Sequence, residues 1–279
     1  MRLCERIVTQ RRKGAKKGKM NQINQKITVL FLGTGTSQGV PVIACPCAVC
    51  ASTDPLDKRL RCSALVQVDG KNILIDSGPD FRQQMLRAGV TQLDAILFTH
   101  GHKDHTAGLD DVRAYNYVMQ RPTDIYAEEQ VQDIIRQEFA YIFADVKYPG
   151  VPELNMHTIN ETPFVIDYIK VTPIRAMHMN LPILGFRIGR MAYLTDANSI
   201  SEKEKEKLYG LDCFVVNGLR KESHISHFSL NEALSLIDDI NPERAYITHI
   251  SHQMGFHRQV QAGLPKNVFL AYDGLEVGV

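Results

Sequence analysis

Three histidines and an aspartate lie within six positions of the sequence, directly after an apolar run that predicts a strand (AILF, 95–98). In an extended segment His100 and His102 point the same way because side chains alternate, and a following turn can bring Asp104 and His105 back to a neighbouring point. Imidazole and carboxylate suit zinc, iron or manganese. The segment THGHKDH (99–105) therefore predicts a metal site at a strand end, with ligands that two adjacent ions could share.

Three further candidate ligands end or follow other predicted strands. His178 lies just after the strand expected around 164–174, Asp196 ends MAYLTD (191–196), and His249 ends AYITH. A single histidine or aspartate in such a place is more often a cap or a satisfied polar residue. Together with the loop at 100–105, however, these side chains provide enough ligands for two metal ions, with an aspartate available to bridge them.

A second group of candidate ligands is rich in sulfur. Cys45, Cys47 and Cys50 crowd into six residues, a spacing that favours metal binding over disulfides in a cytoplasmic chain. Structural zinc takes four closed ligands of sulfur and nitrogen, so this triad lacks one, and Cys62 is one candidate for it. Cys62 and Cys213 otherwise lie in apolar stretches that predict small core residues.

Length and composition favour one large globular domain. The chain has 279 residues, of which 44% are hydrophobic and 23% charged, and this excludes a disordered, collagenous or coiled-coil protein. No apolar run approaches the roughly 18–20 residues that would span a bilayer, and residues 1–26 lack the apolar core of a signal peptide. We therefore expect a cytoplasmic protein without a membrane partner.

The positive charge is concentrated in the first 26 residues. They carry nine Lys or Arg against one acid, which leaves 23 basic and 30 acidic residues in 27–279. This composition predicts a basic, disordered extension over 1–26, followed by a folded domain over 27–279. Met20 also allows residues 1–19 to reflect an upstream start. The acidic body makes nucleic acid an unexpected partner, although the basic extension keeps it open.

Short apolar runs bounded by Gly, Asp and Asn predict strands, and they come in two groups with helices between them. Two such groups suggest sheets packed on each other with helices outside, an α/β (α+β) fold. Ser229 and Glu232 have the capping-box spacing at the start of the last expected helix. The strands are expected at 27–33, 63–68, 72–78, 94–100, 164–174, 184–189, 191–196, 212–218 and 244–249, and the helices at 79–89, 124–140 and 229–239.

The order and spread of these ligands resemble the metallo-β-lactamase superfamily of hydrolases. The resemblance covers residues 27–279 and implies a four-layer αββα sandwich with two divalent ions, manganese or zinc, between the sheets. It further implies that one ion is held by His100, His102 and His178, the other by Asp104, His105 and His249, and that Asp196 bridges the two.

Other motifs look like the cyclic phosphodiesterases of the PhnP type, which are often dimers. They are LGTGTSQGVP (32–41), CPCAVC (45–50), THISHQ (248–253) and the terminal AYDGLEVGV (271–279). This resemblance implies a separate structural zinc on Cys45, Cys47, Cys50 and His252, a small Cys3His zinc clip. The glycines of 32–41 lack the lysine of a phosphate-binding P-loop and predict a tight turn over the site.

The resemblance implies hydrolysis of small, cyclic phosphodiesters by a metal-activated water. Asp104 would orient this water and could accept its proton, whereas the leaving alkoxide needs a proton donor. For that donor, and for contact with the substrate phosphate, the resemblance favours His227 in SHISHFS (223–229), although the spacing also allows His224. Arg113 suits phosphate binding by a bidentate guanidinium, but a helix salt bridge to Asp110 explains it equally well.

Two other activities use the same metal motif. A tRNA 3′-processing endonuclease would need a protruding arm to grip RNA, and no Gly, Pro or basic insertion predicts one. Hydrolysis of a thioester or lactam by the same site stays open. The sequence does not choose between zinc and manganese, because the same nitrogen and oxygen ligands accept both.

Overall fold

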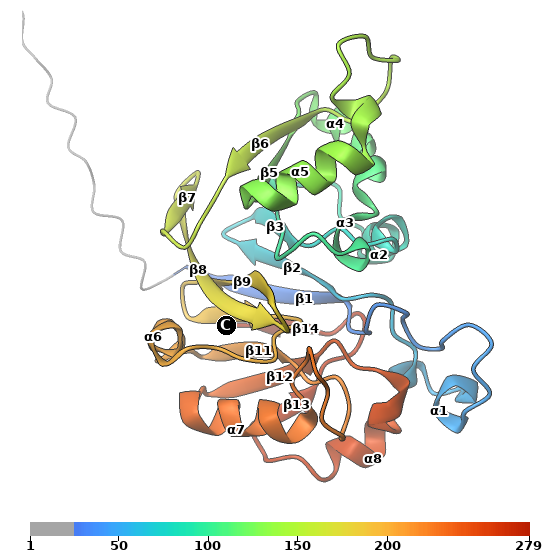
Figure 1. The fold of residues 1–279 in the computed structure, drawn as a ribbon, viewed down its shortest axis with the longest axis vertical. Coiled ribbons are helices and arrows are strands. Elements are labelled where there is room, and N and C mark those ends of the chain that lie inside the picture. Colours follow the sequence, from blue (N-terminus) through green and yellow to red (C-terminus); the bar gives the residue numbers. More distant parts are fainter. Residues whose placement is uncertain (1–24) are drawn as a thin grey trace, which may run out of the picture.

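The computed structural model describes residues 25–279, which form two mixed seven-stranded sheets packed face to face (Figure 1). In spatial order the first sheet consists of β14 (Glu276–Gly278), β1 (Ile27–Gly33), β2 (Ser63–Val68), β3 (Lys71–Ile75), β4 (Ala95–Leu97), β5 (Thr123–Ala127) and β6 (Leu154–Thr158). The second consists of β13 (Val268–Leu270), β12 (Arg244–Thr248), β11 (Cys213–Asn217), β10 (Met191–Leu194), β9 (Leu181–Ile188), β8 (Ile169–His178) and β7 (Phe164–Ile166).

Helices cover the outer face of each sheet. In Figure 1, α2, α4 and α5 lie over the first sheet and α7 lies over the second. The α-helices are α1 (Ala48–Ala51), α2 (Phe81–Ala88), α3 (Lys103–Thr106), α4 (Arg113–Met119), α5 (Glu129–Glu138), α6 (Glu202–Lys205), α7 (Leu230–Ile240) and α8 (His257–Gln261). This arrangement confirms the four-layer αββα sandwich.

Three apolar clusters follow from these layers. The largest joins the inner faces of the two sheets, where Phe31 of β1 packs against Tyr246 of β12 with ring centroids 5.6 Å apart. The other two lie between each sheet and its helices. Strands β3, β4, β10, β11 and β12 are buried on both faces, which explains their continuous apolar runs. Cys213 belongs to the inner core, as predicted.

The helix boundaries show local signals of the expected kind. Ser229 caps α7, and the reciprocal bonds with Glu232 complete the predicted capping box. Helix α2 ends at Gly89, which has a φ of 62° and closes the last turn in the left-handed conformation.

Two expected elements were partly wrong. The helix expected over 124–140 begins only at Glu129, because the preceding residues form β5 and bury Ile125 and Ala127 in parallel pairing with β4. The strand expected over 164–174 is instead the hairpin of β7 and β8, which turns at Asp167 with a φ of 52°. In both cases long-range strand pairing overrides a local apolar pattern.

Within residues 25–279, no helix is long and apolar enough to cross a membrane. The predicted basic extension over 1–26 falls almost wholly outside the described residues, so its disorder stays a prediction.

Candidate dinuclear metal site

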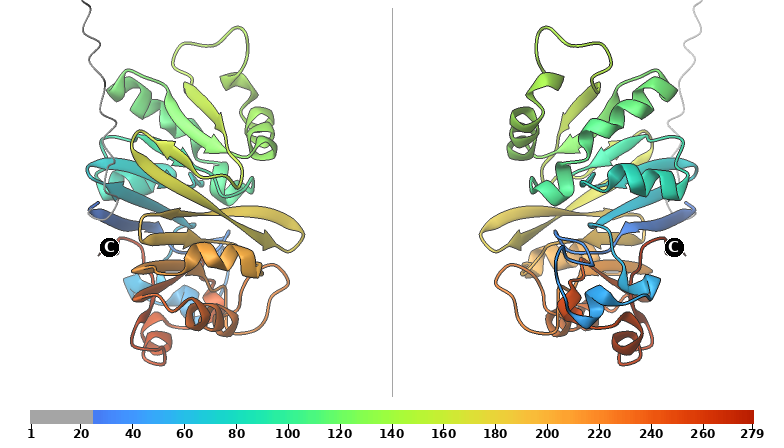
Figure 2. Two further views of the ribbon diagram at one scale, coloured as in Figure 1. Left: turned by 90° about the vertical axis from the view of Figure 1, so that its left-hand side faces the viewer. Right: turned by 90° about the vertical axis from the view of Figure 1, so that its right-hand side faces the viewer.

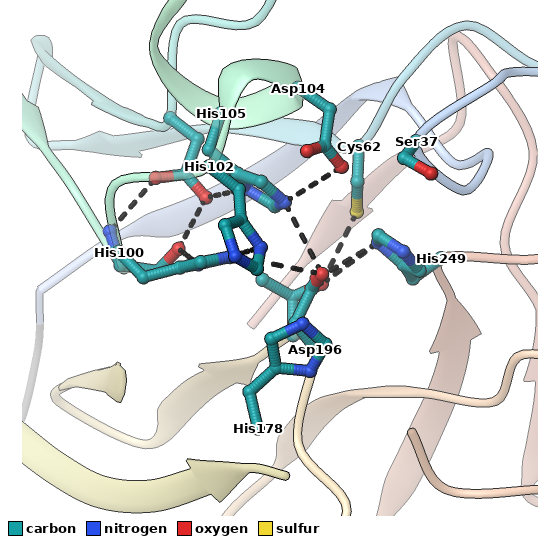
Figure 3. A network of polar contacts seen from close by, with 12 residues as sticks. Ser37, Cys62, His100, His102, Asp104, His105, His178, Asp196 and His249 are labelled. Carbon is teal, nitrogen blue, oxygen red and sulfur yellow. Dashed lines mark hydrogen bonds and ion pairs between the residues drawn. The ribbon is translucent and has the colours of Figure 1, made fainter. Parts of the chain in front are cut away.

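The seven predicted catalytic ligands converge where strands of the two sheets end (Figure 3). His100 to His105 follow β4, His178 ends β8, Asp196 follows β10 and His249 follows β12. Asp196 and His249 have φ values of 60° and 55°, left-handed conformations that cost energy for residues other than glycine. Such strained positions are frequent at functional sites.

The first group consists of His100, His102 and His178, whose ligand atoms all lie within 4.8 Å of one another. His100 Nε2 is 3.1 Å from His102 Nδ1, and the rings of His102 and His178 have centroids 5.1 Å apart. His100 and His178 are buried while His102 is exposed, so this group borders solvent on one side. The side chains of His100 and His102 thus point the same way, as the alternation along an extended segment predicted.

The second group consists of Asp104, His105, Asp196 and His249, also within 4.8 Å of one another. His105 Nε2 lies 3.2 Å from an Asp104 oxygen and 3.4 Å from an Asp196 oxygen. Asp196 also lies 2.9 Å from His249 Nδ1 and 3.9 Å from His100 Nε2, so its carboxylate faces both groups. This is the position that a bridging ligand requires.

Electrostatics differ between the two groups. Burial lowers the pKa of His100 well below its usual value, and burial followed by the charge of His178 lowers that of His102, so both are neutral near pH 7. In the second group burial opposes the charged form of His249, but Asp196 outweighs it and raises the pKa to about 10. The pKa of His105 rises likewise, because nearby carboxylates outweigh its burial.

One buried atom points to a missing partner. His105 Nε2 is fully buried, and it has no hydrogen-bond partner although it faces two carboxylates. Buried polar atoms are usually satisfied, and a metal ion between His105, Asp104 and Asp196 would satisfy this one. The donor set of imidazole nitrogens and carboxylate oxygens therefore fits two divalent ions of the zinc or manganese type.

Asp76 contacts the second group, although nothing in the sequence alone singled it out. It follows β3, has a φ of 62°, and its Oδ2 lies 2.7 Å from Nδ1 of His105. The amide and hydroxyl of Thr99 donate to the same carboxylate at 2.9 and 2.8 Å. A carboxylate in this place fixes the tautomer and orientation of a metal-binding histidine. The only signal in the sequence is the aspartate that ends the run NILID.

Gly78 allows the ligand loop to approach Asp76. A Cβ at this position would lie 2.0 Å from the backbone carbonyl oxygen of Asp104. Ser77 donates its amide to the carbonyl of His105 at 2.8 Å, which joins the two turns. The turn after β3 thus fixes the position of the ligand loop (100–105) relative to the first sheet.

His227 also contacts Asp196. Its Nε2 is 3.3 Å from Asp196 Oδ2, and with His178 these residues form a third group of closely spaced donor atoms. Burial lowers the pKa of His227 to about 4, against the opposing effect of Asp196. His224 lies behind His227, with 3.3 Å between their Nδ1 atoms. The structure therefore places His227, rather than His224, next to Asp196.

The three clustered cysteines meet a histidine far away in the sequence. Cys45 Sγ and Cys47 Sγ lie 3.4 and 3.2 Å from His252 Nδ1, and Cys50 completes a group of four donors within 4.8 Å. A hydrogen bond from the Cys50 amide, followed by one with His252, lowers the pKa of Cys47 to about 6, which favours the thiolate that binds metal. We call these four residues the clip.

Cys62, the other candidate for the fourth position, lies elsewhere. It is buried beneath the second histidine group, where its sulfur is 3.0 Å from the hydroxyl of Tyr193 and 3.3 Å from that of Thr248. The structure thus places His252, rather than Cys62, with Cys45, Cys47 and Cys50, and a structural zinc on these four residues stays a prediction.

The clip lies beside the metal-ligand cluster in the chain and in space. His252 follows His249 by three residues, and the amide of Ile250 between them donates to Thr34 at 2.8 Å. The amide of Thr36 donates to the carbonyl of Ile250 at 3.1 Å. The glycine-rich segment 32–41 therefore pairs with the residue that follows His249, just after β12. Figure 2 shows the segment around α1 packed beside the C-terminal part of the chain.

Arg113 has a partner on its own helix turn. Its guanidinium lies 3.1 Å from Asp110, and its side chain is 48% exposed. This is the helix salt bridge that the sequence also allowed. Among the described residues, Asp110 is the one acid that pairs with Arg113, and a role in phosphate binding stays a prediction.

Residues 71–250 match the beta-lactamase superfamily domain. The chain therefore belongs to the metallo-β-lactamase superfamily, whose fold it carries. Within that superfamily it is similar to a solved diphosphatase from the PhnP family, with 40% identity and a TM-score of 0.86 over 91% of this chain and 97% of the other.

Two further relatives differ from this chain, one in length and the other in sequence. An octanoyltransferase from Porphyromonas gingivalis is 44% identical over 250 residues, 88% of this chain, but this chain spans only half of that protein's length. The zinc-bound PqqB of Methylobacterium extorquens shares the fold with a TM-score of 0.74 over 90% of this chain and 100% of the other, at 21% identity.

Proposed function

We propose that this protein is a dinuclear metal-dependent hydrolase of small phosphodiesters or diphosphates. The observation that carries the proposal is the position of Asp196, whose carboxylate faces both histidine groups at 2.9 to 3.9 Å. Two divalent ions held by groups that share this ligand would supply positive charge to a reacting phosphorus centre. The similarity to a PhnP-family diphosphatase supports phosphorus as the reacting atom.

His100, His102 and His178 would hold one ion, and Asp104, His105 and His249 the other. When bound, two divalent ions make water a nucleophile at neutral pH and neutralise charge on the phosphate oxygens. Asp76 keeps the proton of His105 on Nδ1, so that Nε2 presents its lone pair to the centre of the site. The carbonyl of Ser226 does the same for His178, at 2.7 Å from Nδ1.

Asp104 and His227 would carry out the two proton transfers of the reaction. The carboxylate of Asp104 lies among the ligand atoms of the second group, 3.2 Å from His105 Nε2. From there it could orient the attacking water and accept its proton. As the bond from phosphorus to the leaving oxygen breaks, His227 donates a proton to that oxygen. Burial disfavours protonated His227, but a substrate phosphate beside it would offset this effect with its negative charge.

The proposed catalytic metals are manganese or zinc, and the clip would hold a structural zinc. Four sulfur and nitrogen donors leave no open coordination position, which is typical of a structural rather than a catalytic site. The clip would then stabilise the loop 42–57 against the end of β12, next to His249.

Acyl transfer or thioester hydrolysis is the second candidate. It is favoured by one observation, the 44% identity to a protein named octanoyltransferase. This chain corresponds to only half of that protein, and activated water at the same two metals could equally attack a thioester carbonyl. A tRNA 3′-processing activity has less support, since a human tRNase Z shares the fold at 20% identity.

A substrate panel tests the proposal. Metal-loaded protein is assayed with a cyclic ribose phosphodiester, a dinucleoside diphosphate, an octanoyl thioester and a tRNA precursor, and Asp104→Ala serves as the blank. We expect turnover of a phosphorus substrate that is lost in the blank. Turnover of the thioester or the tRNA alone would contradict the proposal, as would equal turnover by the Asp104→Ala variant.

A further inference from the structure

A small pocket opens beside the first histidine group, between α5 and the β8–β9 hairpin. It has a volume of about 170 Å³, and His100 and His102 form one end of it. Its other walls are Val131 and Ile134 of α5, Leu181 and Pro182 of the hairpin, and Gln130 at the helix start. The pocket is therefore apolar except for the two imidazoles and one amide.

The walls of the pocket join the ligand residues directly. Ile134 packs on Gly101, between His100 and His102, so closely that a Cβ on Gly101 would lie 2.4 Å from Ile134 Cδ1. On the opposite wall Leu181 pairs with His178 in the hairpin register. All three histidines of the first group thus adjoin a pocket wall.

Two ion pairs hold α5 at a fixed distance from the rest of the site. Glu128, just before the first turn of α5, accepts hydrogen bonds from the two terminal guanidinium nitrogens of Arg175 on β8, at 2.8 and 2.5 Å. Near its end, Glu138 pairs with Lys103 in the ligand loop at 2.6 Å. Bidentate carboxylate–guanidinium pairs fix geometry as well as charge. The two pairs therefore link the two ends of α5 to β8 and to the loop that carries His100 and His102.

Two exposed apolar side chains lie close in the chain to residues of the candidate site. Met179 follows His178 and is 52% exposed, and Ile225, two residues before His227, is 73% exposed. Asn198 joins them, since it accepts from the amide of Met179 at 2.9 Å and donates to the carbonyl of Ile225 at 3.0 Å. Exposed apolar residues grouped at a site are typical of ligand contact.

We infer that this pocket is a specificity subsite that binds a flat apolar group, such as a phenyl or other six-membered aromatic ring, attached to the reacting phosphorus. The inference rests on the proposed function, which it deepens by naming a substrate class. Its size fits, because an apolar cavity of about 150 Å³ binds benzene in another protein. Gln130 at the mouth could donate to a ring nitrogen and so favour a heteroaromatic ring.

Binding of three phosphonates to the metal-loaded full chain tests the inference without turnover. Methyl-, phenyl- and 1-naphthylphosphonate carry the same charged group, so differences in affinity, measured by calorimetry, report the apolar part alone. We expect phenylphosphonate to bind at least ten-fold more tightly than methylphosphonate, since burial of a ring in an apolar pocket has an effect of about this size.

Variants at Leu181 localise the preference, because this residue lines the pocket and its side chain is only partly buried. Leu181→Trp fills the pocket and should reduce the phenyl-to-methyl ratio of affinities to about one. Leu181→Ala enlarges it and should shift the preference toward naphthyl. The matched control is Leu86→Trp, an exposed leucine of α2 that does not line the pocket, and it should keep the wild-type ratio.

The outcomes separate the two proposals. Equal affinity of the wild type for all three phosphonates, together with turnover of a phosphodiester, would overturn the subsite and leave the proposed function intact. The same holds if Leu181→Trp keeps the wild-type ratio. No phosphonate binding and no phosphodiester turnover would overturn both.

Discussion

Oδ2 of Asp76 lies 2.7 Å from Nδ1 of His105, and the same carboxylate receives the amide and hydroxyl of Thr99. Asp76 follows β3 and Thr99 follows β4, and these two strands pair in parallel. This relationship holds the histidine whose other nitrogen is buried without a hydrogen bond. The pairing of β3 with β4 in the first sheet therefore fixes the orientation of the His105 ring.

Replacing Asp76 by asparagine should weaken metal binding without unfolding the protein. The amide NH₂ would face Nδ1 of His105, move the histidine's proton to Nε2 and block the lone pair that the ion needs. We expect an affinity loss of about 10- to 100-fold for the second ion, the size usual for such supporting carboxylates. Competition with a metal indicator measures it, and Asp133→Asn, in an exposed ion pair, is the control. An unchanged affinity would contradict this role.

Metal loading should release protons. His105 and His249 hold raised pKa values in the metal-free protein because nearby carboxylates outweigh burial, so both carry a proton at pH 7 that an ion must displace. His100 and His102 are neutral and contribute none. We expect a drop in pH when the metal-free site is loaded in weak buffer with the clip already filled. Binding without proton uptake or release would argue against this charge distribution.

Loss of one clip cysteine should affect the catalytic site. Cys47→Ser removes one of the four donors of the clip, and His252, which follows His249 by three residues, then loses its contact with Cys47. We expect a lower melting temperature, by roughly 2–4 °C for each kcal/mol lost in a chain of this size, together with lower activity and zinc content. A Cys47→Ser protein that keeps both full activity and its melting temperature would refute the coupling.

The effect of His227 should depend on the leaving group. If this histidine donates the proton, His227→Asn should slow hydrolysis about 10²- to 10⁴-fold for an alkoxide leaving group and much less for 4-nitrophenolate, which leaves without protonation. The ratio of kcat values for the two esters measures this. Because His224 lies behind His227, His224→Asn serves as the comparison and should reduce both rates to a similar extent. Equal losses for both esters in His227→Asn would rule out the proton-donor role.

His257 should make the fold sensitive to acid. Burial, followed by the charge of Arg59, lowers the pKa of His257 to about 4, so the folded state stays neutral where the unfolded chain takes up a proton. Stability should therefore fall as the pH decreases from about 6.5 to about 4. His257→Asn keeps a partner for Arg59 without titrating, and its unfolding free energy should vary less over this window. The reverse difference between the two proteins would contradict the assignment.

The sequence was informative wherever one residue carried its own signal. His100, His102, Asp104 and His105 are close in the chain, and the ends of strands are few, so the candidate ligands could be named before the fold was known. Asp76 carried no such signal, because an aspartate after a strand is usually a cap. Its role arises only when parallel pairing of β3 with β4 places it beside Thr99.

The misplaced elements have the same origin. The segment 124–128 has apolar spacing that a helix also shows, and only its position between β4 and β6 makes it a strand. The apolar pocket likewise depends on contact between α5 and the β8–β9 hairpin, which lie far apart in the sequence. Local patterns do not contain such long-range relationships.

Turnover of a phosphodiester against metal equivalents tests the central claim most directly. Protein with its clip zinc-filled and its catalytic site empty is titrated with manganese, using the best phosphorus substrate of the panel, in the wild type and in Asp196→Asn. We predict that activity rises until two equivalents are bound, and that Asp196→Asn, which loses the shared carboxylate charge, stays inactive at this loading. Full activity after one equivalent, or in Asp196→Asn at two equivalents, would contradict a dinuclear hydrolase bridged by Asp196.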